Sequence, residues 1–385
     1  MLFAKLNDLS IGGKGAYGIA ASAVERKADL PTYLRITDIF DDGTLNLSEL
    51  KSVDAPNSDK YLLKPNDIVF ARTGGSTGRN YFYDGSDGVF VYAGFLIKFS
   101  IDPEKVNPKY VKYYCRSKQY NDWVQSFNTG STRGNINAQT FGNMEIPLPE
   151  RKQQDYLVSI LEPIDEKIKN NKQVNDNLEQ QAMSLYAEMF LNSSDSNVTS
   201  GTLSDIAVIT MGQSPSGSSY NEDGVGEVFY QGRAEFGFRF PKRRLFTTEP
   251  KRMAEAGDVL LSVRAPVGDL NIAYERCCIG RGLGAIHSKT GHSSFILYTM
   301  FALRSQLDVF NGEGTVFGSI NRDALNAIPI DIPPVTEIDQ FEVVAHPIDE
   351  LIRANYEENC RLEAIRDSLL PKLMSGEIDV SAVQL

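Results

Sequence analysis

The feature that most constrains the fold is a stretch of sequence that occurs twice. Residues 163–168 read Pro-Ile-Asp-Glu-Lys-Ile and residues 347–352 read Pro-Ile-Asp-Glu-Leu-Ile, so the copies are 184 residues apart. The same offset aligns Gly130 with Gly314 without a gap. Self-similarity at a fixed offset is the signature of a repeated architecture. The chain is therefore expected to contain two tandem copies of one fold.

Each copy ends in a segment whose seam residues follow a 4-3-4-3 spacing, which is the 3.5-residue period of a coiled coil. The first seam consists of Leu157, Leu161, Ile164, Ile168, Asn171, Asn175, Leu178, Ala182, Leu185 and Met189. The second consists of Phe341, Ala345, Ile348, Ile352, Asn355, Asn359, Leu362, Arg366, Leu369 and Leu373. An ordinary amphipathic helix is the alternative interpretation of each segment.

Two asparagines occupy the same two positions in both seams, which favours the coiled coil. A seam asparagine lowers stability but fixes the register of the helices. In an antiparallel pair the middle of one helix meets the middle of the other. This predicts that Asn171 pairs with Asn359 and Asn175 with Asn355, so that the buried amides satisfy each other's hydrogen bonds.

The repeat divides the 385 residues into six segments. These are a globular domain at 1–150, a long helix at 151–191, a polar linker at 192–200, a second globular domain at 201–335, a second long helix at 336–376 and a tail at 377–385. Each domain is long enough for its own core. We expect an α+β fold in which two pseudo-symmetric mixed α/β domains are joined by two long antiparallel coiled-coil helices.

Composition argues against several classes of protein. No run of about 18 apolar residues occurs, as a membrane span requires, and the N-terminus lacks the basic and apolar regions of a signal peptide. The four cysteines form no CxxC pair and the three histidines are scattered, so neither a disulfide framework nor a metal site is expected. These features are typical of a cytoplasmic protein.

The net charge of −11 is unevenly distributed. Residues 151–200 carry 5 basic and 8 acidic side chains, and residues 336–385 carry 4 and 11, so the two helical segments hold −10 of the −11. The nearly neutral domains can still present a basic face to a polyanion. The acidic helices should face away from such a ligand or face a basic partner.

In the first domain, residues 64–72 predict a turn that enters a strand, and residues 33–39 alternate like another strand. Small-residue loops follow at 73–80 and 130–135. Glycines permit close approach of a ligand, while hydroxyl and Arg side chains donate to phosphate or guanine. The candidate nucleic-acid contacts here are Lys14, Arg72, Thr73, Ser76, Thr77, Arg79, Arg133 and Asn135. A mobile hairpin loop is the alternative for residues 73–80.

Two helices complete the expected first domain. Residues 108–127 are rich in tyrosine and predict one helix. Asn137 is expected to cap a second, short helix, since Asn is a preferred residue at helix N-termini.

The second domain repeats this plan with different residues. Residues 256–264 are expected to form the same turn and strand as residues 65–72. Residues 314–321 are expected to form the same loop and helix start as residues 130–137. Residues 233–252 carry a local charge of +5 with four interleaved phenylalanines, which favours polyanion binding over a merely solvated surface. The candidate contacts are Arg233, Arg239, Lys242, Arg243, Arg244, Arg264 and Ser319. Since the frames match and the central sequences differ, the two domains should recognise different targets.

No catalytic motif is recognisable. A Walker sequence is missing, and residues 331–335 depart from the Asp/Asn-Pro-Pro-aromatic motif of adenine methyltransferases at Ile332 and Val335. An enzyme that acts alone is therefore disfavoured. A coiled-coil adaptor whose globular domains bind protein is the competing hypothesis.

The duplicated layout resembles the DNA-specificity subunit of type I restriction-modification systems. The resemblance rests on Phe-Gly-Asn-Met-Glu-Ile-Pro-Leu-Pro at 141–149 with the repeat at 163–168, and on Ile-Pro-Ile-Asp-Ile-Pro-Pro at 328–334 with the repeat at 347–352. It ends with Leu-Met-Ser-Gly-Glu-Ile at 373–378. The resemblance covers essentially the whole chain.

The resemblance implies a non-catalytic subunit with two target-recognition domains, each binding one half of a split double-stranded DNA site. It also implies two methyltransferase subunits that bind S-adenosylmethionine and methylate adenine. Restriction subunits driven by ATP would complete the complex, with Mg as a further cofactor on the partner subunits. No cofactor is expected on this chain.

Overall fold

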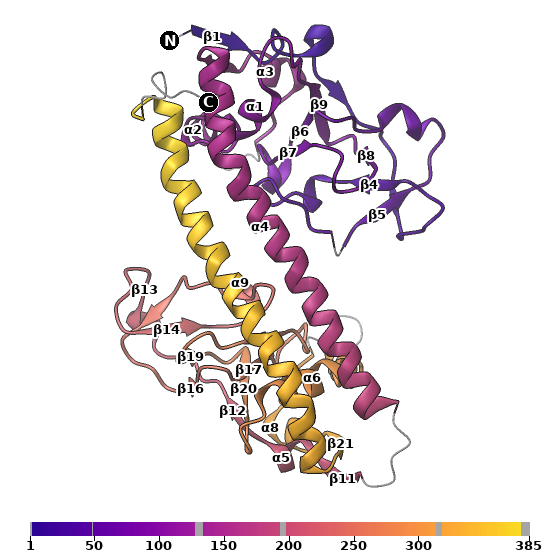
Figure 1. Ribbon diagram of the computed structural model, residues 1–385, viewed down its shortest axis with the longest axis vertical. Coiled ribbons are helices and arrows are strands. Elements are labelled where there is room, and N and C mark those ends of the chain that lie inside the picture. The colour runs from indigo at the N-terminus through magenta and orange to yellow at the C-terminus, as the bar shows by residue number, and fades with distance from the viewer. Residues whose placement is uncertain (1, 48, 128–133, 193–197, 313–317, 379–385) are drawn as a thin grey trace. The chain divides into compact units, whose positions relative to one another are not determined.

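The computed structural model describes residues 2–47, 49–127, 134–192, 198–312 and 318–378. The chain folds into two compact units, whose elements are labelled in Figure 1. The first unit combines Met1–Lys169 with Asn359–Leu385, and the second is Asn170–Glu358. Each unit therefore contains one globular domain and a part of both long helices.

The first domain is built on two sheets. Its strands are β1 (Leu2–Lys5), β2 (Ala16–Tyr17), β3 (Ala23–Val24), β4 (Thr32–Leu34), β5 (Lys51–Val53), β6 (Asp67–Ala71), β7 (Asn80–Tyr83), β8 (Phe90–Tyr92), β9 (Leu96–Ser100) and β10 (Glu145–Leu148). The sheet orders are β2-β9-β6-β7 and β3-β5-β4-β8, while β1 pairs with β10. The helices are α1 (Pro108–Tyr114), α2 (Lys118–Gln125) and α3 (Ala138–Gly142).

The second domain has the same plan. Its strands are β11 (Thr199–Thr202), β12 (Ala207–Met211), β13 (Tyr220–Asn221), β14 (Glu227–Tyr230), β15 (Phe246–Thr247), β16 (Met253–Ala254), β17 (Val259–Ser262), β18 (Leu270–Ile272), β19 (Cys277–Ile279), β20 (Leu283–Ser288) and β21 (Pro329–Ile332). The sheet orders are β12-β20-β17-β18 and β13-β15-β14-β19-β16, while β11 pairs with β21. The helices are α5 (Leu203–Ile206), α6 (Ser293–Ala302), α7 (Arg304–Asp308) and α8 (Arg322–Asn326).

The central strands β6 and β17 begin in the same way in both domains. The Asp67 carboxylate accepts a hydrogen bond from the Lys64 backbone N–H at 2.8 Å, and Asp258 accepts from Glu255 N–H at 2.8 Å. Both strands are flanked by antiparallel neighbours at equivalent places in the sheet, β6 by β9 and β17 by β20. The predicted turn and strand, and their repetition in the second domain, are confirmed.

The strand predicted at 33–39 is shorter than expected. β4 ends at Leu34 because the buried Asp38 carboxylate accepts hydrogen bonds from the Arg35 backbone N–H (2.8 Å) and from its guanidinium (2.5 Å). These bonds fold Ile36–Asp38 into a 3-10 turn. The alternation of apolar residues did not reveal this side-chain capping.

The helix predicted at 108–127 is two helices, because the Ser117 hydroxyl caps a new N-terminus by accepting from the Tyr120 N–H at 3.3 Å. The cap predicted at Asn137 is confirmed, since its side chain accepts from the Thr140 N–H at 2.9 Å.

The two long helices are α4 (Arg151–Tyr186), which continues into a π turn at Ala187–Leu191, and α9 (Val335–Ser375). In the second unit they run antiparallel, with the Asn355 amide donating to the Asn175 side-chain oxygen at 2.8 Å. This predicted pair is confirmed. Asn171 donates to Glu358 at 2.7 Å. Because Asn171 and Asn359 belong to different units, their pairing stays a prediction.

The long helices complete the core of each unit. The main core of the first unit includes Phe70, Phe99, Phe141, Leu157, Leu161, Leu370 and Leu373. That of the second unit includes Ala182, Tyr186, Leu261, Ile286, Phe295, Phe341 and Ala345. Removing the helices would expose this apolar surface to water, so each domain depends on them for stability.

The aspartate of the repeated Pro-Ile-Asp-Glu sequence anchors each domain to its helix. In the first unit the Asp165 carboxylate contacts Arg116 (2.9 Å), Tyr113 Oη (3.0 Å), Lys112 (3.1 Å) and Arg366 (3.2 Å). Although burial acts in the opposite direction, the positive charges of Arg116 and Lys112 lower the pKa of Asp165 to about 2.

In the second unit the equivalent carboxylate, Asp349, accepts from Tyr298 Oη at 2.8 Å and pairs with Arg239 at 3.1 Å. Arg239 also pairs with Glu179 of α4 at 2.7 Å. A Tyr–Asp hydrogen bond beside a mostly or fully buried cation is thus common to both units. The recurrence of the motif reflects this anchoring as well as the helical seam.

Candidate nucleic-acid interface

The backbone at the end of β6 brings together predicted residues from two loops. Arg72 N–H donates to the Phe95 carbonyl at 3.1 Å, and the Arg72 carbonyl accepts from Ile136 N–H at 2.9 Å. Thr73 forms a β-bridge with Asn135. We call Tyr17, Arg72, Thr73, Phe95 and Asn135 the first rim. The main chain therefore fixes three of the predicted contacts side by side.

Two residues of the first rim, Tyr17 and Phe95, were missed in the sequence. The Arg72 guanidinium carbon lies 5.3 Å from the Tyr17 ring centre and 6.0 Å from that of Phe95. The two aromatic residues are 43% and 55% exposed. They reach Arg72 from β2 and from the turn before β9, so no local spacing indicated them.

The loop after the first rim uses several predicted donors for its own structure. The Thr77 hydroxyl lies 2.8 Å from the Gly74 carbonyl and 2.9 Å from that of Gly134. Ser76 is buried, and Arg79 forms an ion pair with Asp41 at 2.7 Å. Lys14 is exposed in the turn before β2. Arg133 lies outside the described residues.

The second domain builds the corresponding site at the end of β17. Val263 N–H donates to the Gly282 carbonyl at 2.9 Å, and the Val263 carbonyl accepts from Ile320 N–H at 3.1 Å. Arg264 forms a β-bridge with Ser319, and both are exposed. We call Arg264 and Ser319 the second rim. The counterpart of Arg72 is thus Val263, and Arg264 corresponds to Thr73, one residue away from the match that the sequence suggested.

The basic patch at 233–252 is partly neutralised by ion pairs, most of them with acids from outside the patch. Its ion pairs are Arg233 with Asp269, Arg243 with Glu275, and Arg244 with Glu235 (2.5 Å) and Glu222 (3.4 Å). Lys242 is exposed and forms no ion pair with any described residue. A local charge of +5 in the sequence therefore overstates the positive surface, because ion pairs between distant residues are invisible there.

Arg239 is buried, and its predicted role as a DNA contact is wrong. It was predicted to lie on the DNA-facing surface, but its side chain is only 2% exposed and pairs with Glu179 and Asp349. Burial raises the pKa of Glu179. Because a buried cation between two carboxylates cannot reach a phosphate without breaking both pairs, Arg239 is a structural residue.

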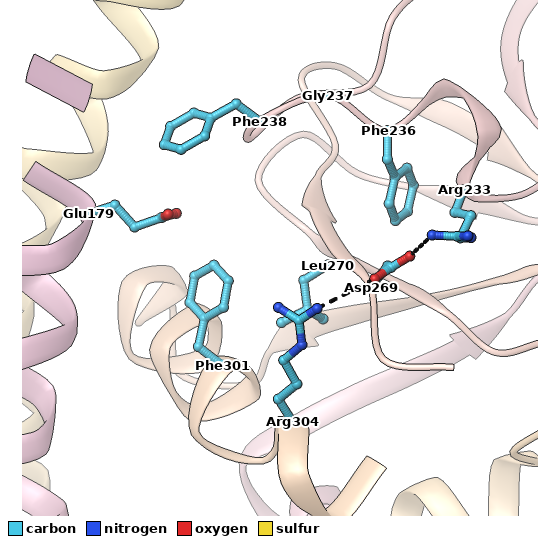
Figure 2. Close-up of a pocket in the computed structure, with 9 residues that line it drawn as sticks. All are labelled: Glu179, Arg233, Phe236, Gly237, Phe238, Asp269, Leu270, Phe301 and Arg304. Atoms are coloured by element: carbon cyan, nitrogen blue, oxygen red, sulfur yellow. Dashed lines mark hydrogen bonds and ion pairs between the residues drawn. The ribbon is translucent and has the colours of Figure 1, made fainter. Parts of the chain in front are cut away.

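A pocket of about 350 Å³ lies beside this ion-pair cluster. Figure 2 shows Arg233 and Arg304 on either side of Asp269, with Phe236, Phe238 and Phe301 around the opening and Glu179 facing them from α4. Phe238 is exposed, whereas Phe240 is buried against Tyr274 and Tyr356. The interleaved phenylalanines thus divide between a pocket wall and the core.

Comparison with known proteins decides the family. The model of the type I restriction modification DNA specificity domain matches residues 25–180 and again 195–359. The chain belongs to the type I restriction-modification DNA specificity family. The duplicated match falls on the two domains and on parts of the long helices. DNA target recognition is the general role of these specificity subunits, and the family is in general non-catalytic.

Individual relatives agree with this assignment. The chain is 30% identical over 343 residues to the putative type I restriction enzyme MjaX specificity subunit of Methanocaldococcus jannaschii, covering 83% of this chain and 80% of the relative. It is 23% identical to the MjaIX specificity subunit of the same organism, covering 73% of this chain and 71% of the relative. The crystal structure of a type I S subunit from M. genitalium matches with a TM-score of 0.57 at 17% identity, over 97% of this chain and 95% of that one, which supports the fold.

Two negative findings concern only the described residues. None of their helices is long and apolar enough to cross a membrane. They also contain no group of His, Cys, Asp and Glu side chains arranged to hold a metal ion.

Proposed function

We propose that this specificity subunit recognises a split double-stranded DNA target, with the first rim contacting one half-site and the second rim the other. One observation carries the proposal: the two domains share strand order, register and backbone hydrogen bonds around the rims, yet differ in the side chains there. A common frame with different exposed side chains suits two different base sequences, since bases are distinguished by side chains that reach their edges.

Methylation-site sequencing of DNA modified by the complex with its methyltransferase partner tests this proposal. The wild type is expected to give a motif of two specific halves separated by unspecified bases. Arg264→Ala in the second rim should alter one half or weaken binding, and it should leave the sequence of the other half unchanged. A continuous motif without a gap, or a variant that alters both halves, would contradict the proposal.

We also propose that the exposed surface of the long helices positions two methyltransferase subunits. On α9, Val343, Pro347 and Leu351 follow one another at intervals of four residues, so they share a face. Val343 is 74% exposed and Leu351 47%. Asp339 precedes this row by four residues and Glu350 lies beside it. An apolar row with acidic neighbours fits a partner surface that is apolar with basic edges.

The equivalent row on α4 is more polar, because Ser159 replaces Val343 and Lys167 replaces Leu351. The two docking surfaces should therefore differ in affinity. In native mass spectrometry the wild type should bind two methyltransferase subunits, and Leu351→Asp should lose one of them at low concentration. Ser159→Asp, a matched change on α4, should have a smaller effect. A strict one-to-one wild-type complex would refute this stoichiometry.

The chemistry of the complex is assigned to the partners in this proposal. The methyltransferase subunits would bind S-adenosylmethionine and methylate adenine, and restriction subunits would use ATP and Mg. The chain by itself should leave DNA unmodified in the presence of S-adenosylmethionine, ATP and Mg. Methylation should require addition of the methyltransferase subunits.

A further inference from the structure

We propose that Arg72, which lies against Tyr17 and Phe95, contacts a guanine in the half-site bound by the first domain. The inference rests on the proposed function and adds to it the base and the residue that selects it. Tyr17 and Phe95 act as positioning residues for the guanidinium.

The main chain and the rings restrict Arg72 to a small range of positions. Its N–H and its carbonyl are both used in backbone hydrogen bonds, to Phe95 and Ile136 respectively. The guanidinium lies within 6.0 Å of two ring centres, a distance at which cation–π attraction operates. Tyr17 is itself fixed, because its hydroxyl accepts from Ala138 N–H at 3.1 Å. A pre-positioned donor loses less conformational entropy when it binds.

Within the described part of the chain, this side chain has unused hydrogen-bonding capacity. Arg72 Nε is buried without a hydrogen-bond partner among the described residues. No described carboxylate forms an ion pair with Arg72, whereas Arg35 and Arg79 of the same domain pair with Asp38 and Asp41. A buried guanidinium N–H without an acceptor is costly, so the site favours a ligand that supplies one.

Guanine is the base that fits such a donor. In the major groove it presents two acceptors, N7 and O6, to which Arg binds through two parallel hydrogen bonds. Adenine replaces one of these acceptors by an amino group, which is itself a donor. A phosphate also accepts from Arg, but it would give no preference among sequences, and this difference separates the two ligands experimentally.

The second domain forms the same sheet without counterparts of the Tyr17, Arg72 and Phe95 side chains. Backbone hydrogen bonds and strand register place Val263 at the position of Arg72, Gly282 at that of Phe95 and Met211 at that of Tyr17. The same sheet order forms with these residues. Two exposed aromatic rings and an unpaired Arg are therefore not required for folding, and a function in binding explains their presence.

The test compares the wild type with Arg72→Val, the residue that the second domain uses, in the complex with methyltransferase subunits. Sequencing of methylated sites should show guanine at one position of one half-site for the wild type, and all four bases there for the variant. Binding to the wild-type site should fall on the order of 5- to 150-fold, which is the discrimination that a bidentate Arg–base contact provides. Circular dichroism should show an unchanged fold.

Two further variants make the outcome decisive. Arg72→Lys keeps the charge but loses the planar fork of donors, so it should restore at most part of the guanine preference. Arg264→Ala should leave that position unaltered. Two results would overturn the inference and leave the split-site proposal intact. One is an unchanged methylation motif with Arg72→Val. The other is that Arg72→Val weakens binding to all sequences equally and that Arg72→Lys restores this binding. A wild-type complex without any sequence preference would instead refute the proposed function.

Discussion

At the scale of single residues, the buried ion pairs matter more for stability than the exposed ones. Asp165 contacts three cations and a tyrosine hydroxyl, with 14% of its side chain exposed. Asp165→Asn should lower the free energy of unfolding of the first unit by about 3 kcal/mol, because it leaves mostly buried cations without their counter-charge. Asp122→Asn, which breaks an exposed pair with Lys118, should change it by less than about 1 kcal/mol. Urea denaturation of both variants checks the difference; equal effects would contradict it.

The lowered pKa of Asp165 predicts a pH dependence. A carboxyl whose pKa falls from 3.8 to about 2 on folding stabilises the protein above its ordinary pKa. That contribution, roughly 2 kcal/mol, is lost as pH falls from about 4 towards 2. Between pH 5 and pH 3 the wild type should lose more stability in urea than Asp165→Asn does. Parallel losses would show that other carboxyls govern acid unfolding.

Arg239 yields a prediction that separates a structural role from DNA binding. Arg239→Ala removes the cation between Glu179 and Asp349 and should destabilise the second unit by about 3–5 kcal/mol in urea denaturation. Arg276→Ala is the matched control, because Arg276 is exposed and its partners Glu227 and Glu255 are accessible to solvent, and this change should cost less than about 1 kcal/mol. If Arg239→Ala leaves stability unchanged but abolishes DNA binding, Arg239 does not have the structural role assigned to it.

At the scale of elements, the asparagine pair between α4 and α9 should behave as a coupled unit. Asn175→Leu or Asn355→Leu alone places a buried amide against an aliphatic side chain and should lower stability by about 1–3 kcal/mol. The double variant should recover most of that loss, since two leucines pack against each other in a seam. A double-mutant cycle with purely additive effects would show that the two amides do not interact in solution.

The sequence predicted those elements that depend on local or periodic patterns. The long helices, the Asn175–Asn355 pair, the Asn137 cap and the turn before β6 all follow from spacing along the chain. The site was predicted less well, because its interactions connect distant residues. Nothing near Arg239 indicated Glu179 or Asp349, and nothing near Arg72 indicated Tyr17. The roles of Arg239 and Arg72 depend on burial and on contacts between residues far apart in the sequence, and the local charge of a segment does not reveal these.

At the scale of the whole molecule, helix length should set the number of unspecified bases between the half-sites. Deleting residues 171–177 and 353–359 together removes one heptad from each helix. Seven residues are close to two helical turns, so the remaining faces stay aligned, and the helices shorten by about 10 Å. The gap in the methylated motif should shrink by about 3 base pairs, at 3.4 Å each, with both half-sites unchanged. An unaltered gap would show that helix length does not determine spacing.

The composition of the first unit has a consequence for the time course of synthesis. Its core includes Leu370 and Leu373, and its Asp165 cluster includes Arg366, all of which follow the second unit in the chain. At about 5–20 residues per second, the ribosome needs roughly 10 to 40 s to make the intervening second unit. The second unit is continuous and can fold as it emerges, whereas the first begins earlier and is completed last. A nonsense mutation near residue 360 would therefore damage the domain at residues 1–150, which is encoded far upstream of it.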